Sequence, residues 1–138
     1  MAAVLRASGL EFDVAAFVDG STWHVAKVFH RGEPRLPRML PGGRKSEESG
    51  LSVVVSEAGF HEFAEQIADA VAFLSDSAPE VRRLVKFPGV SGVVLDFGIG
   101  WRDVVAQSAQ FPAELVRLAG ACGIALELSH YPVTGADA

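Results

Sequence analysis

The segment that decides the fold is "TWHVAKVFHRGEPRLPRMLPGGRKSEESGLSVVVS", residues 22–56. Residues 22–30 and 50–56 are rich in β-branched and aromatic side chains, which favour strands. Between them lie roughly twenty residues that include three prolines and the pair Gly42-Gly43, and both features break regular structure. We therefore predict that the two strands form a hairpin with a long loop at its tip.

On both sides of this hairpin the sequence alternates strands with helices. Apolar residues recur at helical spacing from Phe60 to Leu74, and Ser77 with Glu80 matches a capping box that starts a further helix. From Val93 onward every second side chain is a large apolar one, as in a strand with one buried face. The expected strands are 2–9, 22–30, 50–56, 91–99 and 124–132, and the expected helices are 13–18, 60–74, 77–86 and 112–123.

The resulting order is β-α-β-β-α-α-β-α-β, in which the hairpin interrupts the alternation of strands and helices. This order favours an α+β fold, a two-layer sandwich whose mixed or antiparallel sheet of about five strands carries helices on one face. We treat residues 1–138 as a single α+β domain with a mobile loop at about 31–49 and a frayed tail at 133–138.

The chain has a formal net charge of −5, but its charges are unevenly distributed. From Lys27 to Lys45 there are six basic residues and one acidic residue, whereas the rest of the chain has six basic and sixteen acidic residues. Such a basic segment attracts an acidic protein partner or lies against the acidic residues of its own domain, and the second arrangement is the commoner one. The candidate binding residues in this segment are Arg31, Arg35, Arg38, Arg44 and Lys45.

The composition also bears on where the protein acts. The single cysteine, Cys122, rules out a disulfide within the chain and fits a reducing compartment. No apolar run approaches the ~18 residues of a membrane span, and the start lacks the basic region and apolar core of a secretory signal. We expect a soluble cytoplasmic protein with no membrane partner. Nucleic acid is disfavoured as a partner, because acidic residues follow the bases at once in "SEES" (46–49).

The sequence lacks the motifs of the common catalytic chemistries. Its four histidines do not share the spacing of a metal-binding pair, and no GxSxG nucleophile elbow occurs. The stretch "PGGRKS" (41–46) has the wrong glycine spacing for a phosphate-binding loop. We therefore predict no catalytic residue, no metal ligand and no cofactor.

Acidic and basic side chains share one side of the expected sheet. Asp96 alternates away from its apolar neighbours in strand 91–99, and we expect it to face solvent on the side without helices. Glu127 and Tyr131 have the same phase in the last strand, and Arg6 has the outward phase in the first. If these strands are neighbours, the residues form either a solvated face with cross-strand pairs or, less commonly, a binding surface.

The chain also resembles a known group of bacterial proteins along residues 3–132. The segments that carry the resemblance are "FHRGEPR" (29–35), "SGLSVVVSEA" (49–58), "QIADAVAFL" (66–74), "VVLDFGI" (93–99) and "FPAELVRLAGACGIALELSHYP" (111–132). Their order is similar to that of the domain-of-unknown-function 4279 group and its relatives. One departure is "DGSTW" (19–23), which stands where that pattern often has a proline. The group has no established activity, so the resemblance implies a fold and supplies no catalytic residues.

From these observations we expect a bacterial protein that serves as a non-catalytic binding or interaction domain. An immunity protein that neutralises a toxin by direct binding is the alternative, on analogy with other small acidic domains. An enzyme that uses the open sheet face is the third hypothesis. An uncovered edge strand also favours a homodimer through that edge.

Overall fold

The computed structural model describes residues 3–35, 39, 42–102 and 104–132. Its elements follow one another as β1 (Ala3–Gly9), α1 (Val14–Asp19), β2 (Lys27–Phe29), β3 (Ser49–Ser56), α2 (Phe63–Asp76), α3 (Ala78–Lys86), β4 (Gly92–Trp101), α4 (Ala113–Cys122) and β5 (Ala125–Pro132). The predicted order of strands and helices is confirmed. The frayed tail predicted at 133–138 lies outside the described residues.

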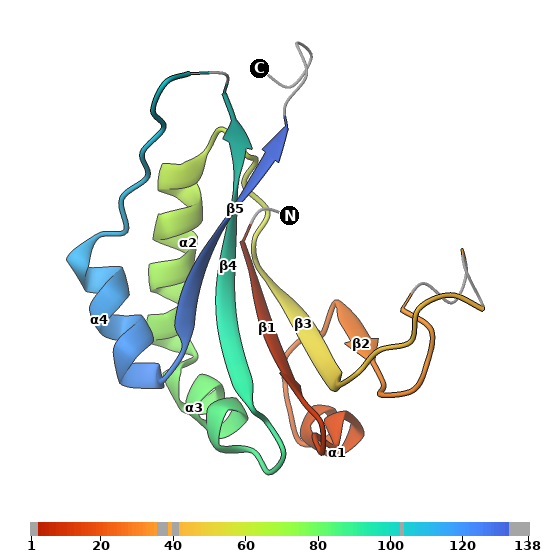
Figure 1. Cartoon of the computed structure of the whole chain (residues 1–138). Helices are drawn as coiled ribbons and strands as arrows, with labels where there is room; N and C mark the ends of the chain where they lie inside the picture. The colour runs from red at the N-terminus through yellow and green to blue at the C-terminus, as the bar shows by residue number, and fades with distance from the viewer. Residues whose placement is uncertain (1–2, 36–38, 40–41, 103, 133–138) are drawn as a thin grey trace.

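The strands form one open mixed sheet in the order β2-β3-β1-β4-β5 (Figure 1). β2 and β3 pair antiparallel, which confirms the predicted hairpin. β1 lies in the centre and pairs antiparallel with both β3 and β4, while β5 pairs parallel with β4 after the crossover through α4. The parallel pair needs such a crossover because its two strands run in the same direction.

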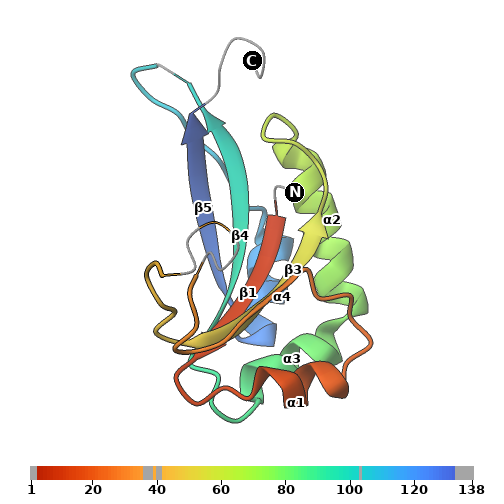
Figure 2. The same ribbon diagram turned by 90° about the vertical axis from the view of Figure 1, so that its right-hand side faces the viewer.

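The helices α2, α3 and α4 lie on one face of the sheet, and the other face is left open (Figures 1 and 2). Alternate side chains of the central strands point into this helix layer and are buried. The largest fully buried side chains are Leu5, Val14, Phe17, Leu51, Gln66, Leu74, Val81, Leu84, Leu95, Phe97 and Leu115. The predicted α+β sandwich with its helices on one face is therefore confirmed. No helix in the described ranges is both long and apolar enough to cross a bilayer.

Three local features differ from the sequence prediction. β2 is only three residues long, because Trp23 leaves the sheet edge and packs its ring against Phe17 and Phe73, with centroid distances of 6.0 and 5.5 Å. The capping box does not form, because Ser77 makes no side-chain cap bond. Glu80 accepts instead from Arg83, at 2.6 Å.

The third difference is a shift of register in the pairing of β1 with β3. Ala3 pairs with Ser56 while Val4 pairs with Val54, so Val55 is an extra residue in its strand, a β-bulge. The bulge ends the simple alternation of β3 and turns Ser56 toward the helix layer. Its hydroxyl donates to Asp69 of α2 at 2.6 Å, which satisfies a buried polar group.

Candidate binding site

The pairing register decides which side chains are neighbours on the open face, which we define as the sheet face away from α2, α3 and α4. One row across the strands, from β2 to β5, consists of Lys27, Ser52, Arg6, Val94 and Ala125. The next row consists of Val54, Val4, Asp96 and Glu127. Arg6 is thus diagonal to Asp96 and within reach of both acidic side chains.

Arg6 bridges three strands of the open face. Its Nη1 donates to Asp96 Oδ2 at 2.6 Å, and its Nη2 donates to Glu127 Oε2 at 2.5 Å. The hydroxyl of Ser129 donates to the second Asp96 oxygen, Oδ1, at 2.7 Å. The sequence correctly placed Arg6, Asp96 and Glu127 on one face, and the observed contacts are cross-strand pairs, one of the two arrangements left open for it.

Asp96 is the exception to the predicted exposure. It has the predicted phase, but its side chain is only 9% exposed, whereas those of Arg6 and Glu127 are 45% and 49% exposed. Arg6 and Ser129 cover the carboxylate from two sides. A buried carboxylate needs charged or polar partners, and both of its oxygens have one. Asp96 therefore acts as a structural link between strands.

The protonation of Arg6 reflects the same contacts. Burial lowers the pKa of Arg6, but the hydrogen bonds and negative charges of Asp96 and Glu127 outweigh burial and raise the pKa overall. The contacts with Asp96 and Glu127 therefore favour the charged form of the guanidinium.

Tyr131 lies on the open face but apart from this network. Four residues of extended chain separate it from Glu127, about 13 Å by strand rise. Its ring stacks on Phe60 with centroids 4.8 Å apart and an interplanar angle of 16°. The backbone of Gly100 lies between the backbones of the two residues, because Gly100 pairs with Tyr131 in the sheet and donates its N–H to the Phe60 carbonyl at 3.3 Å. The structure thus separates Tyr131 from the other predicted open-face residues.

In the connection between β2 and β3, the described residues 30–35, 39 and 42–48 form an arm whose base is a two-stranded ribbon. Gly32 N–H donates to the Ser46 carbonyl at 2.9 Å, Ser46 N–H to the Glu33 carbonyl at 2.8 Å, and Arg35 N–H to the Arg44 carbonyl at 2.9 Å. The arm projects from the sheet on the side away from α2 and α4 (Figure 1). The predicted binding residue Arg38 lies outside the described residues.

Some of the basic side chains of this segment pair with acidic residues of the same chain, and others have no such partner among the described residues. Arg31 pairs with Glu11 at 3.6 Å and Arg44 pairs with Glu47 at 3.8 Å, all with exposed side chains. The described part of the chain contains no acidic partner for Lys27, Arg35 or Lys45. Among the described bases of the segment, Arg31 and Arg44 therefore pair with carboxylates of the same chain, whereas Lys27, Arg35 and Lys45 do not.

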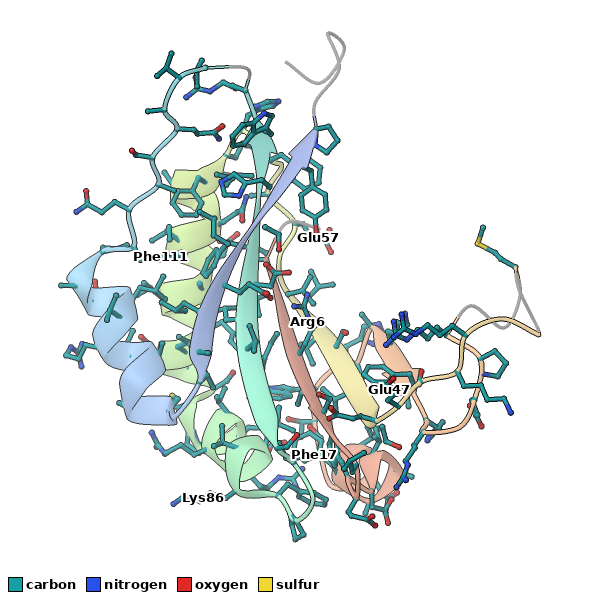
Figure 3. All side chains as sticks on the ribbon, in the orientation of Figure 1. Arg6, Phe17, Glu47, Glu57, Lys86 and Phe111 are labelled. Atoms are coloured by element: carbon teal, nitrogen blue, oxygen red, sulfur yellow. The ribbon has the colours of Figure 1, made fainter. Side chains whose placement is uncertain are left out.

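A groove of about 560 Å³ lies between the arm and the open face. It is lined by Arg6, Lys27, Phe29, Arg35, Ser46, Glu47 and Glu48. Figure 3 shows two of these side chains, Arg6 on the sheet and Glu47 on the arm. The groove joins one predicted binding residue of the arm, Arg35, to Arg6, whereas Arg31, Arg44 and Lys45 do not line it.

The sequence analysis did not select Lys27 or Phe29 as binding residues. Their shared phase in strand 22–30 was the available signal, but it required knowing which face the helices leave open. Phe29 lies flat across Gly50: a Cβ placed on this glycine would be 2.3 Å from the Phe29 ring. The glycine therefore lets an aromatic side chain lie on the sheet at the edge of the groove.

A second cleft, of about 340 Å³, lies on the helix side beside the first turn of α2, where Phe63, Ile99 and Gln107 contribute to its lining. The side chain of Gln107 fixes the turn after β4, because it accepts from Arg102 N–H at 2.9 Å and donates to the Gly100 carbonyl at 2.7 Å. This cleft contains none of the predicted binding residues.

Across the described ranges, no three His, Cys, Asp or Glu side chains converge as they would around a metal ion. No family model, curated protein or solved structure matches this chain significantly. The resemblance to the domain-of-unknown-function 4279 group stays a prediction.

Proposed function

We propose that this protein is a non-catalytic interaction domain that binds an acidic segment of a partner protein in the groove between the arm and the open face. The observation that carries the proposal is the pair of exposed cations Lys27 and Arg35, which line the groove without an acidic partner among the described residues. Phe29 beside them offers an apolar contact.

The other charged groups of the groove are already engaged. Arg6 binds Asp96 and Glu127, Glu47 faces Arg44, and Glu48 accepts from the hydroxyl of Ser91 at 3.3 Å. Lys27 and Arg35 therefore supply the positive charge that remains for a ligand. In our proposal, carboxylates of the ligand pair with these two cations without breaking an existing ion pair.

The charge of the whole chain sets how such binding depends on salt. The net charge of −5 repels an acidic partner at long range, so attraction relies on the local cations. Added salt screens exposed ion pairs, and the affinity for an acidic ligand therefore falls as ionic strength rises.

The arrangement of Asp96 supports binding over catalysis at this face. A general acid or base must exchange a proton with a substrate. Both carboxylate oxygens of Asp96 instead accept hydrogen bonds from Arg6 and Ser129. We therefore favour an interaction domain over an enzyme that works on the open sheet face.

A charge reversal with a matched control tests the proposal. We compare Lys27→Glu/Arg35→Glu with Arg82→Glu/Arg117→Glu, which changes the net charge equally at exposed positions of α3 and α4. The probe is a labelled peptide of alternating glutamate and leucine, measured by fluorescence anisotropy, with a lysine–leucine peptide for comparison. We expect the groove variant to bind the acidic peptide at least about tenfold more weakly and the control to bind like the wild type. Equal weakening in both variants, or equal binding of both peptides by the wild type, contradicts the proposal.

In one version of our proposal, the protein is an immunity protein, and the partner that it binds and neutralises is a toxin. Co-expression with the product of a neighbouring gene tests this version separately. The complex and the rescue of growth should both be lost in the Lys27→Glu/Arg35→Glu variant. If neither complex nor rescue occurs with the wild type, this version is wrong, while the peptide measurement still decides the general function.

A further inference from the structure

The outer edge of β5 is the longest unpaired strand edge that the described sheet presents. β5 is the last strand of the sheet and spans eight residues, whereas β2 at the opposite edge spans three and leads into the arm. In Figure 2, β5 forms one margin of the sheet, with α4 behind the strands and α2 at the opposite margin beside β3. Unpaired backbone N–H and C=O groups along such an edge are a template for another strand.

β5 also lacks the features by which proteins commonly protect a sheet edge. Its sequence "ALELSHYP" (125–132) contains no lysine or arginine, and its proline is the last residue. It pairs with β4 without a register shift, so no bulge twists it away. Its one formally charged side chain, Glu127, is held by Arg6.

We propose that β5 pairs antiparallel with β5 of a second copy of this chain, about a twofold axis perpendicular to the sheet. This interaction goes beyond the proposed function and does not involve Lys27 or Arg35. A perpendicular axis keeps both helix layers on the same side of the joined sheet. Each residue of β5 must therefore lie opposite a residue of the second copy whose side chain points to the same face of the sheet. A symmetric pairing of this kind places one residue of β5 on the axis.

The sequence of β5 selects which residue lies on the axis. With Leu128 there, residues 125–131 of the two copies pair, and Leu128 faces Leu128 of the second copy. Glu127 then faces Ser129, and Ala125 faces Tyr131. An axis at Glu127 would place the Glu127 carboxylates of the two copies directly opposite each other, and like charges in that position destabilise a pair of strands. An axis at Ser129 brings Pro132, which has no N–H to donate, into the pairing opposite Leu126. The Leu128 register leaves Pro132 outside the paired residues and is therefore the favoured one.

The pairing joins two open faces into one ten-stranded surface with an arm near each end. The exposed ring of Tyr131 covers Ala125 of the second copy and adds apolar area to the backbone bonds. Seven paired residues form a small interface by the standards of stable complexes, so we expect a dissociation constant on the order of micromolar.

Cysteine cross-linking tests both the interface and its register. In the variant Ala125→Cys/Tyr131→Cys, the two thiols of one chain are about 20 Å apart along the strand and cannot bond to each other. Opposite residues of an antiparallel pair have Cβ atoms about 5 Å apart, so cysteines 125 and 131 of different copies form disulfides under mild oxidation. Each single variant by itself should stay monomeric on a non-reducing gel, whereas an equimolar mixture of the two should cross-link. Cys122 is buried and stays unchanged as a common background.

Light scattering after size exclusion measures the dimer without cross-links. We expect the wild type to shift from monomer to dimer with increasing concentration. The variant Ala125→Lys/His130→Lys, which adds two cations to the edge, should remain monomeric. Ala121→Lys/Gly120→Lys on the exposed side of α4 is the control with the same charge change and should dimerise like the wild type. A wild type that stays monomeric at millimolar concentration, or a dimer that fails to cross-link through 125 and 131, overturns the proposal.

Discussion

Replacement of Arg6 by methionine tests how the open face is held together, because this one side chain binds two acids of very different exposure. Methionine keeps an apolar stem on the sheet but leaves Asp96, 9% exposed, with Ser129 as its remaining hydrogen-bond donor. Removing one partner of a buried ion pair costs about 3–5 kcal/mol. Since Arg6 is itself 45% exposed, water reaches the vacated side, and we expect a loss of about 2–3 kcal/mol in the free energy of unfolding.

The second acid, Glu127, should contribute much less. Its side chain is 49% exposed, and exposed ion pairs contribute about 0.2–1 kcal/mol. Urea unfolding of Arg6→Met, Asp96→Asn, Glu127→Gln and the two double variants gives a coupling energy for each pair. We expect about 2 kcal/mol for Arg6 with Asp96 and less than about 1 kcal/mol for Arg6 with Glu127. In about 1 M salt the Glu127 coupling should fade, because screening acts most strongly on exposed charges.

Two results would refute this reasoning. If Glu127→Gln destabilises the protein as much as Asp96→Asn, the burial of Asp96 is not what gives its pair with Arg6 the larger energy. If Arg6→Met costs less than about 1 kcal/mol, Ser129 and water satisfy the Asp96 carboxylate without the guanidinium.

Two further substitutions test the contacts beside the groove and in the helix layer. Gly50→Ala should lower the melting temperature, because its Cβ would lie 2.3 Å from the Ala7 carbonyl oxygen, whereas Gly92→Ala meets no atom within 4 Å and should melt like the wild type; equal melting of both variants contradicts this packing. Glu80→Gln tests a pH dependence of stability. The pKa of Glu80 lies below its usual value of 4.5, chiefly because Arg83 donates a hydrogen bond to the carboxylate; burial of Glu80 acts in the opposite direction. The group therefore stabilises the fold above pH 4.5 and loses this contribution as the pH falls through the lowered pKa, so urea unfolding should show a deficit for Glu80→Gln at neutral pH that vanishes in acid; a deficit independent of pH rules out the carboxylate charge as its cause.

The sequence predicted the order of the elements because each has a local pattern. The apolar spacing from Phe60 to Leu74 indicates a helix wherever the segment packs. Gly123, a residue type that commonly ends helices, follows α4 in the left-handed conformation with φ of 80°. The phases of Arg6, Asp96 and Glu127 were also readable, since alternation in a strand is strict when no bulge intervenes.

The remaining features depend on contacts between distant parts of the chain. Trp23 is aromatic, as many strand residues are, but it lies outside the sheet because its ring packs against Phe17 and Phe73. Glu80 matches a capping box, but the Arg83 guanidinium and the hydroxyl of Ser21 compete for it, the latter at 2.8 Å. Local patterns fix the phase of a side chain and leave open what covers it, and Asp96 differs from its predicted exposure for this reason.

On the open face, stability and binding rest on different cations. Arg6 is central to the face, yet its charge is engaged by Asp96 and Glu127, so a ligand that took it would leave a buried carboxylate without its counter-charge. Lys27 lies in the same row of the sheet, separated from Arg6 by Ser52, and has no such commitment in the described chain. Reversing the charge of Lys27 should therefore weaken the binding of acidic ligands and leave the free energy of unfolding nearly unchanged. The Arg6→Met variant should instead lower stability and retain most of the affinity per folded molecule. The two variants must differ in this way if the groove binds through its unpaired cations.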